Sequence, residues 1–258
     1  MTDLRPLPVP ALADNYIWLV AGAEGTAVVV DPGEAAPVRA ELARRQLRLA
    51  AILLTHHHPD HIAGAAELAA TGATIHAPRD ERIACACERI GEGDRVEIAE
   101  AGLGFDVIEV PGHTLSHVAY HGHGLLFCGD TLFSVGCGRL FEGSPAQMLG
   151  SLERLAALPG RTQVCCGHEY TVANCAFARQ LDPDNAALAS RAREAATRRA
   201  RGVAPLPSSL ADERACNPFL RIDTPALVAA LDPERRADRV ARFAELRRRK
   251  DDFRMPAP

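Results

Sequence analysis

Three consecutive histidines at the end of an apolar run constrain this chain more than any other feature of its sequence. The run 51–54 is typical of a buried strand, and from Thr55 the chain continues as THHHPDH. Because side chains alternate along a strand, we expect His56 and His58 to point to one side and His57 to the other. The sequence therefore predicts two metal-competent side chains together at a strand end.

The same segment then enters a helix. Pro59 is typical of the first helical turn, from which Asp60 and His61 would project. Only 10 of the 258 residues are histidine, so such a cluster arises rarely by chance and indicates a metal site. His57 is expected to pack or hydrogen bond behind that site.

Three further candidate ligands each follow an apolar strand by a glycine-containing turn. The strands are 105–110, 125–128 and 163–166, and the candidates that follow them are His113, Asp130 and His168. Side chains at strand ends can open on one edge of the sheets, which is the placement that a shared site requires.

The remaining histidines have simpler interpretations. We expect His76, His121 and His123 at the surface or at sheet edges. His117 lies four residues after His113, and its position also suits a residue that holds another ligand in orientation.

Short apolar or β-branched runs bounded by turn residues recur along the chain and are typical of strands. They span 16–21, 26–31, 51–55, 73–77, 105–110, 125–128 and 163–166. Helical patterns lie between some of them, at 37–46, 62–70 and 145–158. Paired strands with occasional helices predict an α/β fold in which helices flank packed sheets.

The last third of the chain has a helical pattern. Helices are predicted at 171–181, 185–201 and 233–249. In the last of them Val240, Phe243 and Leu246 recur at helical spacing and can pack against one face. We therefore predict a catalytic α/β domain over 1–168 and a helical domain over 169–258.

Composition limits the kind of protein. No apolar run reaches the roughly 18–20 residues that cross a bilayer, and the first residues do not resemble a secretory signal. The eight cysteines show no repeated zinc-site spacing, so free thiols are expected. We expect a cytoplasmic monomer with no nucleic-acid or membrane partner.

Charge is unevenly distributed along the chain. The residues from Arg191 onward contain 16 basic and 10 acidic residues, a net charge of +6, whereas the first 190 residues carry −10. An arginine-rich solvated helix face explains this distribution from charge alone. The alternative is a positive surface that favours an anionic ligand.

The motif HxHxDH, followed by GH, GD and GH at strand ends, resembles the metallo-β-lactamase superfamily. Within it, segments along almost the whole chain resemble the glyoxalase II family of hydroxyacylglutathione hydrolases. These segments are LADNY at 12–16, CGDTLF at 128–133, GCG at 136–138, CGHEY at 166–170, NPF at 217–219 and KDDFRMP at 250–256. The resemblance implies an αββα sandwich followed by a helical domain that binds substrate.

The resemblance also implies a site for two divalent metal ions. The first ion would be bound by His56, His58 and His113, the second by Asp60, His61 and His168, and both by Asp130. We expect zinc, with iron or manganese as alternatives, because histidine and carboxylate ligands suit all three. Asp60 would also orient a hydroxide that bridges the ions, so Asp60 and Asp130 are the expected catalytic residues.

Five further positions are implied to contact the glutathione part of the substrate. They are Arg139, Phe141, Tyr170, Arg247 and Lys250. Lys250 is the only lysine in a chain with 28 arginines, which favours a specific role for it. Arg139 stands where family members often have lysine, and Phe141 stands where they often have tyrosine, so donor geometry changes at one position and a hydroxyl is lost at the other.

Such a site implies hydrolysis of a thioester. Two cations that share a water lower its pKa toward neutrality, and the resulting hydroxide can attack the thioester carbonyl. A thiol has a reference pKa of about 8.5, so the thiolate leaves without a strong general acid. The resemblance implies that the substrate is S-(2-hydroxyacyl)glutathione, with D-lactoyl as the acyl group, in methylglyoxal detoxification.

Two other activities of the same superfamily are the alternatives. A persulfide dioxygenase would use one iron and lack the long helical tail. An RNA-processing nuclease would use the arginine-rich helices as a phosphate platform, although the basic residues here are not interleaved with exposed aromatic ones. A metallo-β-lactamase proper would have cysteine in place of Asp130.

Overall fold

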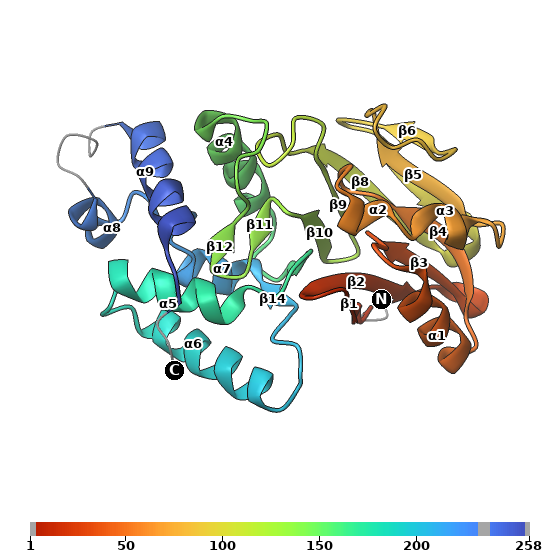
Figure 1. Ribbon diagram of the computed structural model, residues 1–258, viewed down its shortest axis with the longest axis horizontal. Coiled ribbons are helices and arrows are strands. Elements are labelled where there is room, and N and C mark those ends of the chain that lie inside the picture. The colour runs from red at the N-terminus through yellow and green to blue at the C-terminus, as the bar shows by residue number, and fades with distance from the viewer. Residues whose placement is uncertain (1–3, 232–237, 256–258) are drawn as a thin grey trace. The chain divides into compact units, whose positions relative to one another are not determined.

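The computed structural model describes residues 4–231 and 238–255, and its elements are labelled in Figure 1. The chain forms two compact units that alternate along the sequence. The first comprises Met1–Val110, Ser116–Gly129 and Cys165–Glu169, and the second comprises Pro111–Leu115, Asp130–Val164 and Tyr170–Pro258. The domain division at residue 168 stays a prediction from sequence pattern.

The first sheet of the first unit has six strands that follow one another in chain order (Figure 1). They are β1 (Leu7–Ala11), β2 (Asn15–Ala21), β3 (Thr26–Val30), β4 (Arg48–Leu53), β5 (Thr74–Pro78) and β6 (Glu88–Ile90). Strands β1 to β3 are antiparallel, and β3 to β6 are parallel. All five residues of β3 are buried, which is typical of a strand covered on both faces.

A second sheet has the order β14 (Ser208–Ser209), β13, β10, β9, β8, β7. Its other strands are β7 (Arg95–Ile98), β8 (Leu103–Glu109), β9 (Val118–Gly122), β10 (Leu125–Gly129) and β13 (Gln163–Cys166). Two buried side chains join it to the first sheet. Trp18 Nε1 donates to the Cys166 carbonyl over 2.9 Å, and the Tyr120 hydroxyl donates to the Leu54 carbonyl over 2.8 Å. These rings therefore lie in a core between two packed sheets.

Short helices complete the first unit. They are η1 (Ala23–Gly25), α1 (Ala35–Arg45), α2 (Pro59–Ile62), α3 (Ala65–Ala69) and η2 (Ala99–Ala101). Val38 and Leu42 of α1 and Leu68 of α3 belong to one buried cluster with the first sheet. Helix α2 begins at Pro59, directly after His58, so the strand end and the helix start are separated by only a few residues.

The second unit is mostly helical. Its elements are β11 (Leu132–Phe133), β12 (Gly136–Cys137), α4 (Pro145–Ala156), α5 (Thr171–Leu181), α6 (Ala186–Ala200), β14 (Ser208–Ser209), α7 (Leu210–Cys216), α8 (Pro225–Ala230) and α9 (Arg239–Asp252). Strands β11 and β12 form a hairpin, and β14 pairs with the start of β13. Phe243 and Leu246 of α9 are fully buried, as their helical spacing predicts.

Most predicted elements are confirmed, and α5 matches its prediction residue for residue. The single helix predicted at 62–70 is wrong, because α2 ends at Ile62 and α3 begins after Gly64. Gly64 lies in the turn between them, and a Cβ there would lie 2.6 Å from the backbone of Glu34, so only glycine allows this close approach. Residues 233–237 of the last predicted helix lie outside the described residues, and α9 continues to Asp252.

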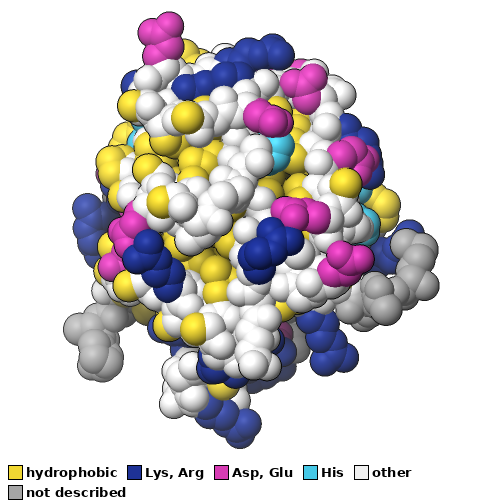
Figure 2. Space-filling model, turned by 90° about the vertical axis from the view of Figure 1, so that its right-hand side faces the viewer, with side chains coloured by type: hydrophobic (Ala, Val, Ile, Leu, Met, Phe, Trp, Pro, Cys, Tyr) yellow, Lys and Arg dark blue, Asp and Glu magenta, His cyan; other side chains and the backbone are white. Residues whose placement is uncertain are grey.

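The face on the side of α1 and α3 carries acidic and basic side chains interspersed, as Figure 2 shows. Over residues 4–231 and 238–255, we find no helix with the length and apolar character needed to span a bilayer. All eight cysteines are free thiols, as their spacing predicts.

Candidate active site

The triple-histidine segment has the geometry that strand alternation predicts. His56 Nε2 and His58 Nδ1 lie 3.0 Å apart, so these two rings do face the same side. His57 lies elsewhere, with its Nδ1 3.4 Å from a carboxylate oxygen of Asp80. The interpretation of His57 as a residue behind the site is consistent with this contact.

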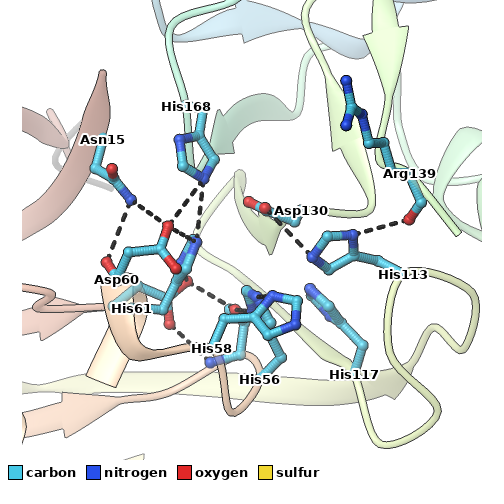
Figure 3. Close-up of polar contacts among 12 residues, drawn as sticks. Asn15, His56, His58, Asp60, His61, His113, His117, Asp130, Arg139 and His168 are labelled. Atoms are coloured by element: carbon cyan, nitrogen blue, oxygen red, sulfur yellow. Dashed lines mark hydrogen bonds and ion pairs between the residues drawn. The ribbon is translucent and has the colours of Figure 1, made fainter. Parts of the chain in front are cut away.

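The first turn of α2 and the end of β13 bring three more predicted ligands together. Figure 3 shows Asp60, His61 and His168 turned toward one another. His168 Nε2 lies 3.3 Å from His61 Nε2 and 3.4 Å from Asp60 Oδ2. The hydrogen bond from His168 is the main reason, and that from His61 the second, why the pKa of Asp60 lies well below its usual range. The carboxylate is therefore charged and can accept a metal ion.

His61 and His168 are oriented by carboxylates, as histidine ligands of metal ions usually are. His61 Nδ1 lies 3.0 Å from Asp31 Oδ2, and His168 Nδ1 lies 2.8 Å from Asp14 Oδ1. When one ring nitrogen is bound by a carboxylate, the tautomer is fixed and the other nitrogen is available to a metal. In both rings that other nitrogen is Nε2, the atom that faces the cluster. The donor set and its orientation therefore fit a divalent cation.

Three residues that support this cluster were not predicted. Asp31 accepts from Thr55 Oγ1 at 2.7 Å as well as contacting His61, so its carboxylate orients other groups. Asn15 Nδ2 donates to Asp60 Oδ2 over 3.0 Å, and Asp14 holds His168 as described above. One signal for Asp31 was available, because it directly follows an apolar strand.

The other two predicted ligands lie together in the second unit. His113 Nε2 is 3.4 Å from Asp130 Oδ2, and His113 Nδ1 is 2.9 Å from the carbonyl oxygen of Arg139, as the dashed lines in Figure 3 mark. Gly138 allows the backbone to pass close to Asp130, since a Cβ on Gly138 would lie 1.8 Å from the Asp130 carbonyl oxygen. The GCG segment is therefore folded tightly against the segment that carries Asp130.

A cavity of about 410 Å³ in the second unit is lined by His113, Asp130 and all five predicted substrate contacts. Those five are Arg139, Phe141, Tyr170, Arg247 and Lys250. Phe141 is 63% exposed, and its ring centroid lies 5.2 Å from that of His113. Three cations and two aromatic rings thus share a hollow with two predicted metal ligands, which suits an anionic organic ligand.

Arg247 differs from the other two cations of this cavity. Its guanidinium is buried, donates to the Cys137 carbonyl over 2.6 Å and to Asp251 over 3.0 Å, and lies 5.2 Å from the Phe219 ring centroid. Arg139 has a largely exposed side chain near Asp251. One part of the donor capacity of Arg247 therefore joins α9 to β12, and another part is used within α9.

His76 and His117 can be compared with what the sequence predicts for them. His76 is buried in β5, between β4 and β6, so its prediction as a surface or edge residue is wrong. The apolar run that contains it belongs to the parallel part of the sheet, where both faces are covered. His117 stacks on His56 with ring centroids 4.6 Å apart, which accords with a supporting role.

Comparison with known proteins first identifies the superfamily to which the fold belongs. The family model described as the metallo-beta-lactamase superfamily matches residues 12–84 and 88–168. The structure of ETHE1 from Myxococcus xanthus has a TM-score of 0.62 at 26% identity, covering 94% of this chain and 99% of that one. TTHA1623 in a di-iron-bound form has a TM-score of 0.55 at 30% identity, covering 64% and 92%. The fold and the histidine cluster define a metal-dependent hydrolase of this superfamily, and the predicted α/β fold class is confirmed.

The matches then narrow to one family. The model of the hydroxyacylglutathione hydrolase C-terminus matches residues 169–253. A hydroxyacylglutathione hydrolase from Xanthomonas axonopodis pv. citri is 51% identical, covering 97% of this chain and all of that one. One from Xylella fastidiosa is also 51% identical, covering 97% and 98%. The chain therefore belongs to the hydroxyacylglutathione hydrolase family. Its fold and its His/Asp clusters support a dinuclear metal site.

Proposed function

We propose that this protein hydrolyses the thioester bond of S-(2-hydroxyacyl)glutathione, with D-lactoyl as the acyl group. Relatives at about 50% identity over nearly the whole chain carry the name of that activity. The structural observation that carries the proposal is the cavity of the second unit. There Arg139 and Lys250 line the same hollow as His113 and Asp130. Glutathione has two carboxylates, which complement cations placed beside the reacting group.

We further propose that two divalent metal ions, most simply zinc, bind seven side chains. These are His56, His58 and His113 for one ion, Asp60, His61 and His168 for the other, and Asp130 for both. The di-iron form of TTHA1623, a protein of the same fold, supports a two-ion site and keeps iron as an alternative. When bound, such ions supply an activated water and an electrophile for the thioester carbonyl.

The remaining chemistry belongs to residues of the chain. Asp60, charged and held by Asn15, can accept a hydrogen bond from the attacking water and orient it. Arg139, Tyr170 and Lys250 bind and orient the glutathione part, so that the carbonyl lies at the metal ligands. The glutathione thiolate is a good leaving group, which explains why no additional general acid is needed.

The two alternatives from the sequence are not favoured. Relatives that cover 97% of the chain are named hydroxyacylglutathione hydrolase, a name that refers neither to persulfide oxidation nor to RNA cleavage. The domain division at residue 168, a monomeric state, a cytoplasmic location, and no nucleic-acid or membrane partner stay predictions.

The test uses S-D-lactoylglutathione and protein loaded with zinc, and follows the loss of thioester absorbance. We expect turnover by the wild type and none by Asp130→Ala. The control is Asp106→Ala, because Asp106 is an exposed aspartate on β8 that pairs with Arg95, outside both clusters. Fully metal-loaded, folded wild-type protein without turnover would refute the proposed activity.

A further inference from the structure

A nearly buried carboxylate lies outside the predicted site, in the loop between β5 and β6. Asp80 Oδ1 accepts the backbone N–H of Arg82 at 3.0 Å and its Nε–H at 2.8 Å, while Oδ2 accepts from Nη2 at 2.7 Å. The Arg82 side chain is the main reason that the pKa of Asp80 lies well below its usual range. Asp80 is therefore a fixed negative charge at any pH near neutrality.

The same carboxylate contacts two loops that frame the histidine cluster. Ser116 Oγ donates to Asp80 Oδ2 over 2.5 Å, and His57 Nδ1 lies 3.4 Å from that oxygen. Ser116 directly precedes His117, and His57 is the middle residue of 56–58. One oxygen atom thus links the loop of the triple histidine to the loop that begins β9.

These two loops meet at the ring of His56. The His117 ring stacks on it with centroids 4.6 Å apart and an interplanar angle of 15°. His58 Nδ1 lies 3.0 Å from His56 Nε2, and Thr55 Oγ1 lies 3.0 Å from His56 Nδ1. Figure 3 shows the rings of His56, His58 and His117 at this end of the cluster. The direction of His56 therefore depends on where both loops are held.

We propose that Asp80 is a positioning residue that sets the direction of the His56 and His58 nitrogens by holding His57 and Ser116. The inference rests on the proposed metal site but not on the reaction proposed for it. A carboxylate that touches no metal but orients its histidine ligands typically changes metal affinity about 10- to 100-fold when it is removed. Asp80 differs from such cases because it acts indirectly, through His57, which lies between two proposed ligands, and through Ser116, which precedes the supporting residue His117. We therefore expect the lower part of that range.

The experiment replaces Asp80 by asparagine in the full-length protein, which keeps the shape of the side chain and removes its charge. We expect the affinity for Zn²⁺, measured by competition with a chromogenic chelator, to fall about tenfold. With Co²⁺ in place of Zn²⁺, we expect the visible absorption bands of the ion to change in position and intensity. Those bands report ligand geometry, which a loss of stability alone does not alter.

Two further variants keep the test decisive. Ser116→Ala removes one of the two links and leaves the Asp80–Arg82 pair, so a smaller change in the same direction is expected even if Asp80→Asn does not fold. The control is Asp182→Asn, because Asp182 is also nearly buried and contacts an arginine, Arg221, at 3.2 Å. It should lower stability and leave zinc affinity and the cobalt spectrum unchanged.

The proposal is overturned if folded Asp80→Asn and Ser116→Ala bind Zn²⁺ and Co²⁺ as the wild type does. It is also overturned if Asp182→Asn weakens zinc binding as much as Asp80→Asn. Neither measurement uses a thioester. A wild-type protein that fails to hydrolyse S-D-lactoylglutathione would therefore contradict the proposed function and leave this inference standing.

Discussion

Lys250 shows how local surroundings can set the chemistry of one side chain. Its ammonium group lies 5.2 Å from the Phe253 ring centroid and 5.7 Å from that of Phe177. Burial, followed by the positive charges of Arg247 and Arg139, lowers the pKa of Lys250 from 10.5 to about 8. Burial and the neighbouring arginines destabilise the charged form of Lys250. A carboxylate that enters the cavity relieves this, so the ammonium group binds it strongly.

This pKa predicts an unusual pH profile. Lys250 is charged below pH 8 and loses its proton as the pH rises through 8, whereas an ordinary lysine stays charged to about pH 10. We therefore expect kcat/KM for S-D-lactoylglutathione to fall about three- to tenfold between pH 8 and pH 9.5, mostly through KM. Lys250→Arg keeps its charge over this range and should flatten the alkaline limb. An identical fall in the arginine variant would show that another group titrates.

At the scale of elements, the hairpin β11–β12 is held by buried side chains of the helices that pack around it. Asn217, at the end of α7, donates to the carbonyls of Phe133 and Gly136 over 3.1 and 3.0 Å. Glu213 of the same helix accepts the Val135 N–H at 2.7 Å, and burial raises the pKa of Glu213. This hairpin begins two residues after the proposed bridging aspartate, Asp130, and β12 contains the first two residues of the GCG segment, so the position of the hairpin affects both.

Substitution of Asn217 tests that arrangement. Asn217→Ala leaves two buried carbonyls without their donor, and we expect the free energy of unfolding to fall by about 1–3 kcal/mol in urea titrations. Asn217→Asp should cost more, because a carboxylate cannot donate and would lie beside Glu213, which is 3.1 Å from the Asn217 amide. An aspartate variant as stable as the alanine variant would contradict this account.

The sequence predicted elements and ligands wherever the signal was local. The ligand candidates were found because each follows an apolar strand, and α5 was found from a continuous helical pattern. Local patterns did not predict β1, whose two prolines disfavour a strand away from an edge. Asp31 could be found as a carboxylate at a strand end, but the residues that Asp31 and Asp80 orient lie more than twenty positions away, so spacing could not show what these carboxylates hold. The roles of the seven proposed ligands and five substrate contacts stay predictions until they are tested.

At the scale of the whole molecule, charge is divided between an acidic and a basic part of the chain. The first 190 residues carry −10 and the residues from Arg191 onward carry +6, although the net charge is only −4. The basic part contains Arg247 and Lys250, which line the cavity. The guanidinium of Arg247 already donates to Cys137 and Asp251. Arg139 and Lys250 are therefore the main cations of the cavity that can bind an anion.

This division predicts that substrate binding depends on ionic strength. Screening between charges becomes effective as the Debye length falls from about 30 Å at 0.01 M salt to about 8 Å at 0.15 M. We expect KM for S-D-lactoylglutathione to rise about two- to fivefold over that range, while kcat changes little, because the cations attract the glutathione carboxylates equally in the ground and transition states. Arg139→Gln should raise KM at low salt and give a shallower salt dependence. If salt instead lowered kcat and left KM unchanged, charge in this cavity would act on the chemical step rather than on binding.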